Sequence, residues 1–293
     1  MNAKPYNGLG TALITPFLED GSVDYEALQH LLEAQVAGGV DFIVVLGTTG
    51  ESATLTVEER QQVSLFVRQQ IAGRVPLVLG FGGNNTRQLV DDLRHADLSG
   101  YGALLSVCPY YNKPSQEGLY QHFTALAEAS PLPILLYNVP GRTGVNLLPE
   151  TVVRIYEHCP ERIAGIKEAS GNIDQITRLI GMADGRFSVL SGDDGIAYPL
   201  MQAGADGLIS VASNAFPEAF GEIVHNRRHE AERLQEQYAE MIRLLFVEGN
   251  PSGIKTVLSL QHRIHNVLRL PLVANSQAVQ QQIEHCLKRF DTL

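Results

Sequence analysis

The sequence of 293 residues predicts a (β/α)8 TIM barrel followed by a C-terminal helical extension. Eight short apolar runs recur along the chain, and most are continuously apolar, which is typical of strands buried on both faces of a parallel sheet. Segments with apolar residues at helical spacing separate the runs, and eight such strand–helix units close into a barrel. An open doubly wound sheet fits less well, because there are eight units and no GxGxxG turn.

The predicted strands are short, and the segments that connect them are also short, so we expect parallel pairing throughout. The eight apolar runs, with the turns that follow them, occupy residues 8–17, 41–52, 75–83, 101–111, 133–140, 163–170, 187–194 and 205–213.

Capping residues mark the helices between these strands. Thr56 with Glu59 three residues later forms a capping box, and Asn172 occupies the equivalent first position of a later helix. Pro149 lies where the first turn of a helix tolerates proline. The segment 24–39 has helical spacing and ends in two glycines, as a C-cap does.

The strand pattern stops near residue 215, which predicts two domains. We expect residues 1–215 to form the catalytic barrel and residues 216–293 to form the helical extension. The helices of the extension are predicted within residues 217–246, where one or two helices fit, and within residues 252–263 and 276–290.

Composition excludes several classes of protein. The net charge of −10 argues against nucleic-acid and anionic-membrane partners, and no apolar run has the roughly 18 residues of a membrane span. The hydrophobic content of 44% supplies a full core. Cys108, Cys159 and Cys286 form neither a disulfide framework nor a CxxC metal pair, so we expect a reducing, cytoplasmic location. The N-terminus shows no secretory signal pattern.

Polar residues gather after five of the predicted strands. Active sites of such barrels lie at the carboxyl ends of the strands, so these segments should meet at one rim. They read GTTGES, PYYNKPS, YNVPGRTG, KEASGN and SGDD.

Lys167 is the most informative residue among them. It is the one lysine of five that lies within an apolar strand; Lys255 and Lys288 are expected on surface helices. Burial disfavours the ammonium form, and the neutral amine forms imines with carbonyl substrates. We therefore favour a Schiff-base lysine. The alternative is a lysine paired with a carboxylate, although neighbouring Glu168 should point to the opposite face of the strand.

Other rim residues fit this chemistry but each has a plainer interpretation. Tyr137 could shuttle protons, or be a rim tyrosine with its hydroxyl in water. Arg142 could bind a carboxylate, or form a surface ion pair. Thr48 and Thr49 could cradle a carboxylate near a helix start, or belong to an ordinary glycine-rich turn.

The remaining polar residues favour packing and capping. Tyr110 and Tyr111 at the end of a strand are as often packing or interface residues as catalytic ones. Asp193 and Asp194 should cap the next helix, and no set of residues at ligand spacing accompanies them, so we expect no metal. Cys108 should be a small core residue.

With GTTGE, PYYN, YNVPGRTG and IKE in this order, the chain resembles the dihydrodipicolinate synthase family of the pyruvate-dependent class I aldolases. The likeness spans nearly the whole chain. It implies a (β/α)8 barrel with C-terminal helices, a homotetramer, and no metal or organic cofactor. It also implies that pyruvate forms a Schiff base with Lys167, and that the enamine attacks aspartate 4-semialdehyde in lysine and diaminopimelate biosynthesis.

The resemblance assigns roles at the matching positions. Thr49 would help hold the pyruvate carboxylate. Thr48 would link Tyr137 and Tyr111 in a proton relay, with Tyr111 inserted from a neighbouring subunit across a dimer interface. Arg142 would bind the carboxylate of the semialdehyde.

Two further positions match residues that line the family's site near Lys167. Gly192 is one, and Ile209, whose carbonyl would face the bound adduct, is the other. Sister enzymes such as N-acetylneuraminate lyase and sugar-acid aldolases share the lysine, and several lack the arginine. Arg142 therefore favours the synthase, and a sister aldolase acting on a sugar acid is the alternative.

The chain departs from the family's lysine-inhibited members at Val57, Arg60 and Gln88, where those members carry histidines and a glutamate. We therefore expect weak or absent feedback inhibition by lysine. The rest of that pocket is matched by Ser52, Ala53, Asn84 and Tyr110. The segment EGNPSGIK also departs from the family's usual pattern, and we expect it to lie away from the rim motifs.

Overall fold

The computed structural model describes residues 6–226 and 229–290. Eight strands form a closed barrel in chain order, and the strand pairs in register are parallel. The predicted fold class is confirmed, and the open doubly wound sheet is wrong because the sheet closes. Each strand lies within a predicted apolar run: β1 (Gly8–Ala12), β2 (Phe42–Val45), β3 (Leu77–Gly80), β4 (Ala103–Val107), β5 (Ile134–Asn138), β6 (Ile163–Glu168), β7 (Ser188–Ser191) and β8 (Gly207–Ser210).

The chain divides into two compact units, which are described separately. The first contains Pro76–Ile209 together with the described residues 6–8, and the second contains Leu9–Val75 and the chain from Ser210 onward. The predicted boundary at residue 215 separates the barrel from the C-terminal extension, whereas these two units divide the barrel strands between them. The boundary at residue 215 therefore stays a prediction.

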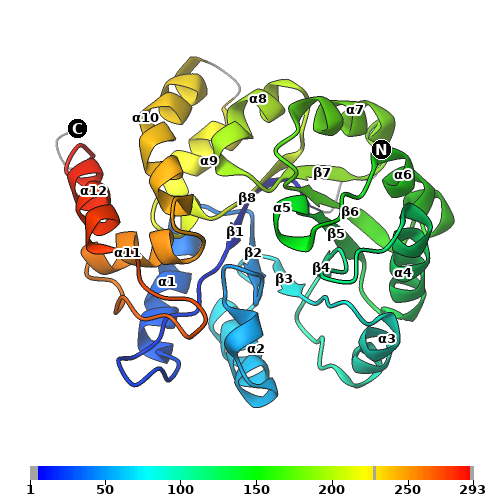
Figure 1. Cartoon of the computed structure of the whole chain (residues 1–293), viewed down its shortest axis with the longest axis horizontal. Coiled ribbons are helices and arrows are strands. Elements are labelled where there is room, and N and C mark those ends of the chain that lie inside the picture. The colour runs from blue at the N-terminus through cyan, green and yellow to red at the C-terminus, as the bar shows by residue number, and fades with distance from the viewer. Residues whose placement is uncertain (1–5, 227–228, 291–293) are drawn as a thin grey trace. The chain divides into compact units, whose positions relative to one another are not determined.

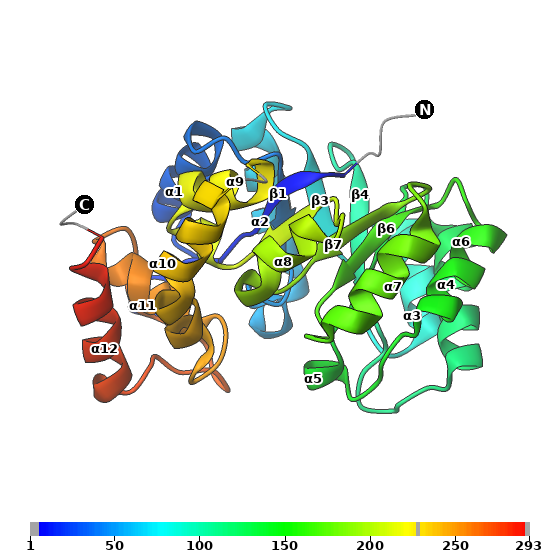
Figure 2. The same ribbon diagram turned by 90° about the horizontal axis from the view of Figure 1, so that it is seen from above.

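The helices of the first unit follow its strands one by one. Helices α3, α4, α6 and α7 lie one beside the next, outside the strands (Figures 1 and 2). Pro149 is the first residue of α6, and the Asn172 side chain accepts a hydrogen bond from the Gln175 backbone N–H at 3.0 Å, as the capping patterns predict. The elements are α3 (Thr86–His95), α4 (Gln116–Ala129), α5 (Pro140–Thr143), α6 (Pro149–His158), α7 (Ile173–Ala183), the 3₁₀ turn η2 (Asp194–Ile196) and α8 (Ala197–Gln202).

The second unit contains the first two helices and the C-terminal ones. The capping box is confirmed: Thr56 Oγ1 accepts from the Glu59 backbone, and the Glu59 carboxylate accepts from the Thr56 backbone. Residues 217–246 form two helices rather than one. The elements are α1 (Tyr25–Ala37), η1 (Ser52–Thr54), α2 (Val57–Ile71), η3 (Ala212–Asn214), α9 (Pro217–His225), α10 (His229–Phe246), α11 (Ser252–Leu260) and α12 (Gln277–Leu287).

Aromatic packing holds the C-terminal helices together. Helix α10 packs against α9, α11 and α12 (Figure 1). The ring of Tyr238 on α10 stacks on Phe290, with 4.5 Å between centroids, and meets the edge of Phe220 from α9. Within the described part of the chain, no helix has both the length and the apolarity that crossing a membrane requires.

Candidate active site

Lys167 and Tyr137 lie beside each other on β6 and β5. They are register partners in the parallel pair, so their side chains share one face of the sheet. The Lys167 Nζ lies 4.5 Å from the centroid of the Tyr137 ring. The two residues are only 6% and 7% exposed. The amine and the phenol are therefore buried together.

Gly192, directly after β7, makes room for the lysine. A Cβ atom at this position would lie 2.9 Å from Lys167 Cε and 3.0 Å from its Cγ. These distances are shorter than van der Waals contact between carbon atoms, about 3.5–4.0 Å. The structure thus brings Lys167, Tyr137 and Gly192 together, as predicted. Ile209 is a fully buried residue of β8.

Glu168 has different partners from Lys167, as the alternation along a strand predicts. Asn138 Nδ2 donates to both carboxylate oxygens of Glu168, at 3.0 and 3.1 Å, and the Ser170 backbone N–H donates to one of them at 2.8 Å. Burial raises the pKa of the Glu168 carboxyl, although these hydrogen bonds act in the opposite direction. The Glu168 carboxylate therefore connects the end of β5, through Asn138, to the turn that follows β6, through Ser170.

The same network fixes the loop that carries Arg142. Arg142 lies in the short helix α5 and is exposed. Asn138, at the end of β5, accepts a hydrogen bond from the Leu147 backbone N–H at 2.9 Å and donates to Asn146 Oδ1 at 2.8 Å. Both ends of the Arg142 loop are thereby attached to β5, so the guanidinium projects from a loop with a fixed base.

The GTTGE turn follows β2 in the second unit. Thr48 is exposed, whereas Thr49 is 3% exposed and Glu51 is 2% exposed. The Thr49 Oγ1 accepts a hydrogen bond from Asn250 Nδ2 at 3.0 Å. Glu51 forms an ion pair with Lys255, with 2.5 Å between Oε1 and Nζ. The hydroxyl of Thr48 is therefore on the exposed side of the turn, whereas the hydroxyl of Thr49 is buried and bonded to Asn250.

Two sequence-based expectations are corrected here. Lys255 is not on a surface helix: its side chain is 0% exposed, because α11 is buried and Glu51 supplies the opposite charge. The segment EGNPSGIK does not lie away from the rim motifs, because its Asn250 and Lys255 both contact the GTTGE turn. Lys255 is the one charged residue in the apolar stretch SGIKTVLSL, and this feature could have indicated its burial. A lysine within an apolar run was also the feature that singled out Lys167.

The tyrosines after β4 are both accessible in the single chain. Tyr111 is 90% exposed and has a left-handed backbone with φ of 75°, and Tyr110 is 42% exposed. Arg142, Thr48 and Tyr111 are thus exposed, in contrast to the buried Lys167 and Tyr137.

The remaining predictions concern packing. Asp193 Oδ1 accepts from the Gly195 backbone at 2.8 Å and so caps η2, as expected. The three cysteines are free and buried, and burial raises the pKa of the Cys108 thiol, which fits a core residue. Among the described residues, no group of three or more His, Cys, Asp and Glu side chains is placed to hold a metal ion.

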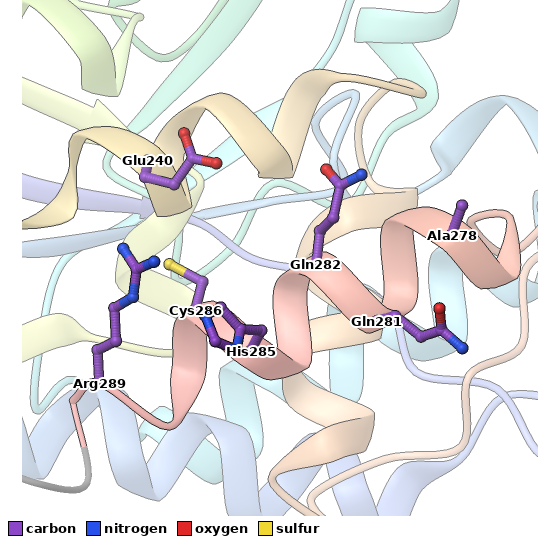
Figure 3. A pocket seen from close by; sticks show the side chains of 7 residues that line it. All are labelled: Glu240, Ala278, Gln281, Gln282, His285, Cys286 and Arg289. Carbon is purple, nitrogen blue, oxygen red and sulfur yellow. The ribbon is translucent and has the colours of Figure 1, made fainter.

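A shallow pocket in the second unit is a surface feature. It lies along α12 and the facing part of α10, and most of its side chains are exposed (Figure 3). It includes none of the predicted site residues. The residues that line it are Glu240, Ala278, Gln281, Gln282, His285, Cys286 and Arg289.

Comparisons with known proteins agree with this arrangement. The model of the dihydrodipicolinate synthetase family matches residues 5–290. The 4-hydroxy-tetrahydrodipicolinate synthase of Parabacteroides distasonis is 50% identical over 287 residues, which cover 97% of this chain and 96% of the relative. That of Porphyromonas gingivalis is 50% identical and covers 95% of each chain. The solved structures of dihydrodipicolinate synthase from Aquifex aeolicus and Thermotoga maritima, each 39% identical, superpose with TM-scores of 0.93 and 0.94; each match covers 98% of this chain, and 98% and 99% of those chains respectively. The chain belongs to the dihydrodipicolinate synthetase family.

Proposed function

We propose that the chain condenses pyruvate with aspartate 4-semialdehyde to give 4-hydroxy-tetrahydrodipicolinate, through a Schiff base on Lys167. The observation that carries the proposal is the buried pair of Lys167 and Tyr137 in a barrel of this family. The enzyme is a lyase of lysine and diaminopimelate biosynthesis, like the synthases to which it is similar. The sugar-acid alternative is not favoured, because these full-length relatives are synthases.

The chemistry follows from an amine beside a phenol. The Lys167 Nζ attacks the C2 carbonyl of pyruvate, and water leaves to give an imine. Loss of a C3 proton gives an enamine, whose C3 forms a bond to the aldehyde carbon of the semialdehyde. The amino group of the adduct then attacks the imine carbon and displaces Lys167. The proton transfers are assigned to Tyr137, whose ring lies next to the amine. No cofactor takes part in this sequence.

The other roles are assigned from the family motifs and from residue chemistry. Thr49 holds the pyruvate carboxylate, and Thr48 passes protons between Tyr137 and Tyr111. Arg142 binds the carboxylate of the semialdehyde, because a guanidinium forms two parallel hydrogen bonds with a carboxylate.

Two further assignments concern the walls of the site. Gly192 leaves space for the lysine and its adduct, and the Ile209 carbonyl faces the adduct. The close approach of the Lys167 side chain to Gly192 supports the first assignment.

We infer that the active assembly is a homotetramer in which Tyr111 crosses a dimer interface. The 90% exposure of Tyr111 in the single chain supports this, because a partner subunit would cover it. The substrates and the free, buried cysteines fit an enzyme of the cytoplasm.

The test is turnover of pyruvate with aspartate 4-semialdehyde, coupled to reduction of the product. We expect Arg142→Ala to raise the KM for the semialdehyde about 10–100-fold, because a charge-assisted hydrogen-bonded contact is lost. Arg154→Ala, a change at an exposed arginine that pairs with Glu117, is the matched control and should leave turnover unchanged. A wild type that forms the pyruvate imine but ignores the semialdehyde would overturn the substrate assignment.

A further inference from the structure

The segment between α10 and α11 contacts the GTTGE turn. Asn250 lies in this segment and is 6% exposed, and its Nδ2 donates to Thr49 Oγ1 at 3.0 Å. Five residues later, Lys255 pairs with Glu51. Two residues of a threonine-containing turn are thus held by two residues about 200 positions later in the chain.

The chemistry of the two side chains gives the Asn250 contact a direction. The amide nitrogen of asparagine only donates hydrogen bonds, whereas a threonine hydroxyl both accepts and donates. When Thr49 Oγ1 accepts from Asn250, its own proton is left for another acceptor. A carboxylate only accepts hydrogen bonds, so it is the ligand that this orientation of the hydroxyl suits.

The backbone of the turn needs support, and residues of α11, of the chain after α11 and of the chain after β1 supply it. Leu46 and Glu51 have φ values of 58° and 51°, a left-handed conformation that non-glycine residues keep only where their surroundings hold them. The side chain of Glu51 is held by Lys255, and it also accepts a hydrogen bond from the Arg269 backbone at 3.2 Å. Thr15 Oγ1 donates to the Gly50 carbonyl at 2.7 Å.

We propose that Asn250 is a positioning residue for the substrate carboxylate: it holds the Thr49 hydroxyl with its proton directed at pyruvate, while the buried Lys255–Glu51 pair holds the turn. Asn250 acts through Thr49 and does not itself touch the substrate. The inference rests on the proposed function, in which Thr49 binds the carboxylate of pyruvate.

The experiment measures the pyruvate concentration that gives half-maximal borohydride trapping at Lys167, together with kcat and the KM of each substrate. Asn250→Leu removes the donor at similar size, and Asn250→Asp replaces the donor with an acceptor. We expect both to raise the half-maximal pyruvate concentration, by about tenfold for Leu and more for Asp. The KM for the semialdehyde should change less than twofold, about the limit of a weak indirect effect.

A double-mutant cycle separates positioning from general damage. In a Thr49→Val background the hydroxyl is absent, so Asn250→Leu should have little further effect on pyruvate binding. Asn275→Asp is the matched control, because Asn275 is also buried near α11 and α12 but bonds Thr256 and Glu248. It should leave the half-maximal pyruvate concentration unchanged even if it lowers the melting temperature.

The outcomes distinguish this inference from the proposed function. If wild type is not trapped by pyruvate at all, the proposed function fails. If wild type is trapped and Asn250→Leu leaves the pyruvate dependence unchanged, or shifts it equally in the Thr49→Val background, the positioning role is wrong.

Discussion

Two lysines in the described part of the chain are buried, and their surroundings differ. Lys167 lies over the ring of Tyr137, with its Nζ 4.5 Å from the centroid. Lys255 lies 2.5 Å from a Glu51 oxygen and donates to the Val267 carbonyl at 3.0 Å. Burial lowers the pKa of Lys255 to about 8, while Glu51 acts to raise it. Both amines lie over an aromatic ring, since Lys255 Nζ is also 4.1 Å from the centroid of Phe17. The difference is the carboxylate: Glu51 gives Lys255 a structural ion pair, whereas Lys167 has no ion-pair partner among the described residues, which fits its proposed Schiff-base role.

The largest effect should come from Lys167→Ala. We expect a loss of activity of at least ~10³-fold, because no imine can form at alanine. The free energy of unfolding should stay the same or increase, because a buried amine is removed. Turnover, borohydride trapping and thermal unfolding test this together. Lys288→Ala, at an exposed lysine, is the control. If borohydride still trapped pyruvate on another lysine of the Lys167→Ala variant, the assignment of the imine to Lys167 rather than to Lys255 would be wrong.

Replacement of Lys255 should instead lower the free energy of unfolding. Lys255→Met leaves Glu51 buried without its partner, which should lower the free energy of unfolding by about 3–5 kcal/mol. Adding Glu51→Gln should recover most of this, because the uncompensated charge is gone. Denaturant unfolding of both variants makes the measurement. A single variant as stable as wild type would mean that the ion pair does not stabilise α11 against the turn.

Glu168 should affect the second substrate rather than the first. Glu168→Gln places an amide against the Asn138 amide and disturbs the base of the Arg142 loop. We expect the KM for the semialdehyde to rise about tenfold, with trapping of pyruvate at Lys167 nearly unchanged. Glu150→Gln, at an exposed carboxylate that pairs with Arg178, is the matched control. Equal loss for both substrates would show that Glu168 acts on the strand as a whole.

The ion pair of Glu59 with Arg269 predicts a smaller, pH-dependent effect. The hydrogen bonds from Arg269 lower the pKa of Glu59 to about 2, below its ordinary value of 4.5. Its contribution, about 1–2 kcal/mol, is therefore present above pH 4.5 and is lost as the pH falls toward 2. Wild type and Glu59→Gln should differ in stability at pH 6 and converge near pH 2. Glu230→Gln, at an exposed helix pair, should show little difference at either pH.

Free lysine, added as a feedback inhibitor, should have the smallest effect on activity. Gln88 takes the place of a glutamate and donates to Asp92 on its own helix at 2.8 Å. Val57 is 53% exposed and offers no hydrogen bond. We expect activity to be unchanged at micromolar lysine. Half-inhibition in that range, measured at saturating substrates, would contradict the expectation, and Gln88→Glu with Val57→His should increase the response if the two residues are its cause.

The sequence was sufficient for the barrel because each strand is a continuous apolar run followed by a distinct polar turn. It singled out Lys167 as a candidate because this is the one lysine within an apolar strand. It did not reveal the partners of the GTTGE turn, since Asn250 and Lys255 reach it only through folding of a distant segment. The Glu168 network was missed for a similar reason: nothing in IKEAS indicates that Asn138 donates to that carboxylate.

Gly192 sets a limit on how this site can be redesigned. A methyl group does not fit at that position, because Ala169 Cβ and Lys167 Cε lie 2.8 and 2.9 Å from the place where a Cβ would stand. In the proposed mechanism, a larger residue at this position would displace the Lys167 side chain from the carbonyl that it attacks. Diversity in libraries of this enzyme should therefore be placed on the Arg142 loop, and position 192 should be kept constant.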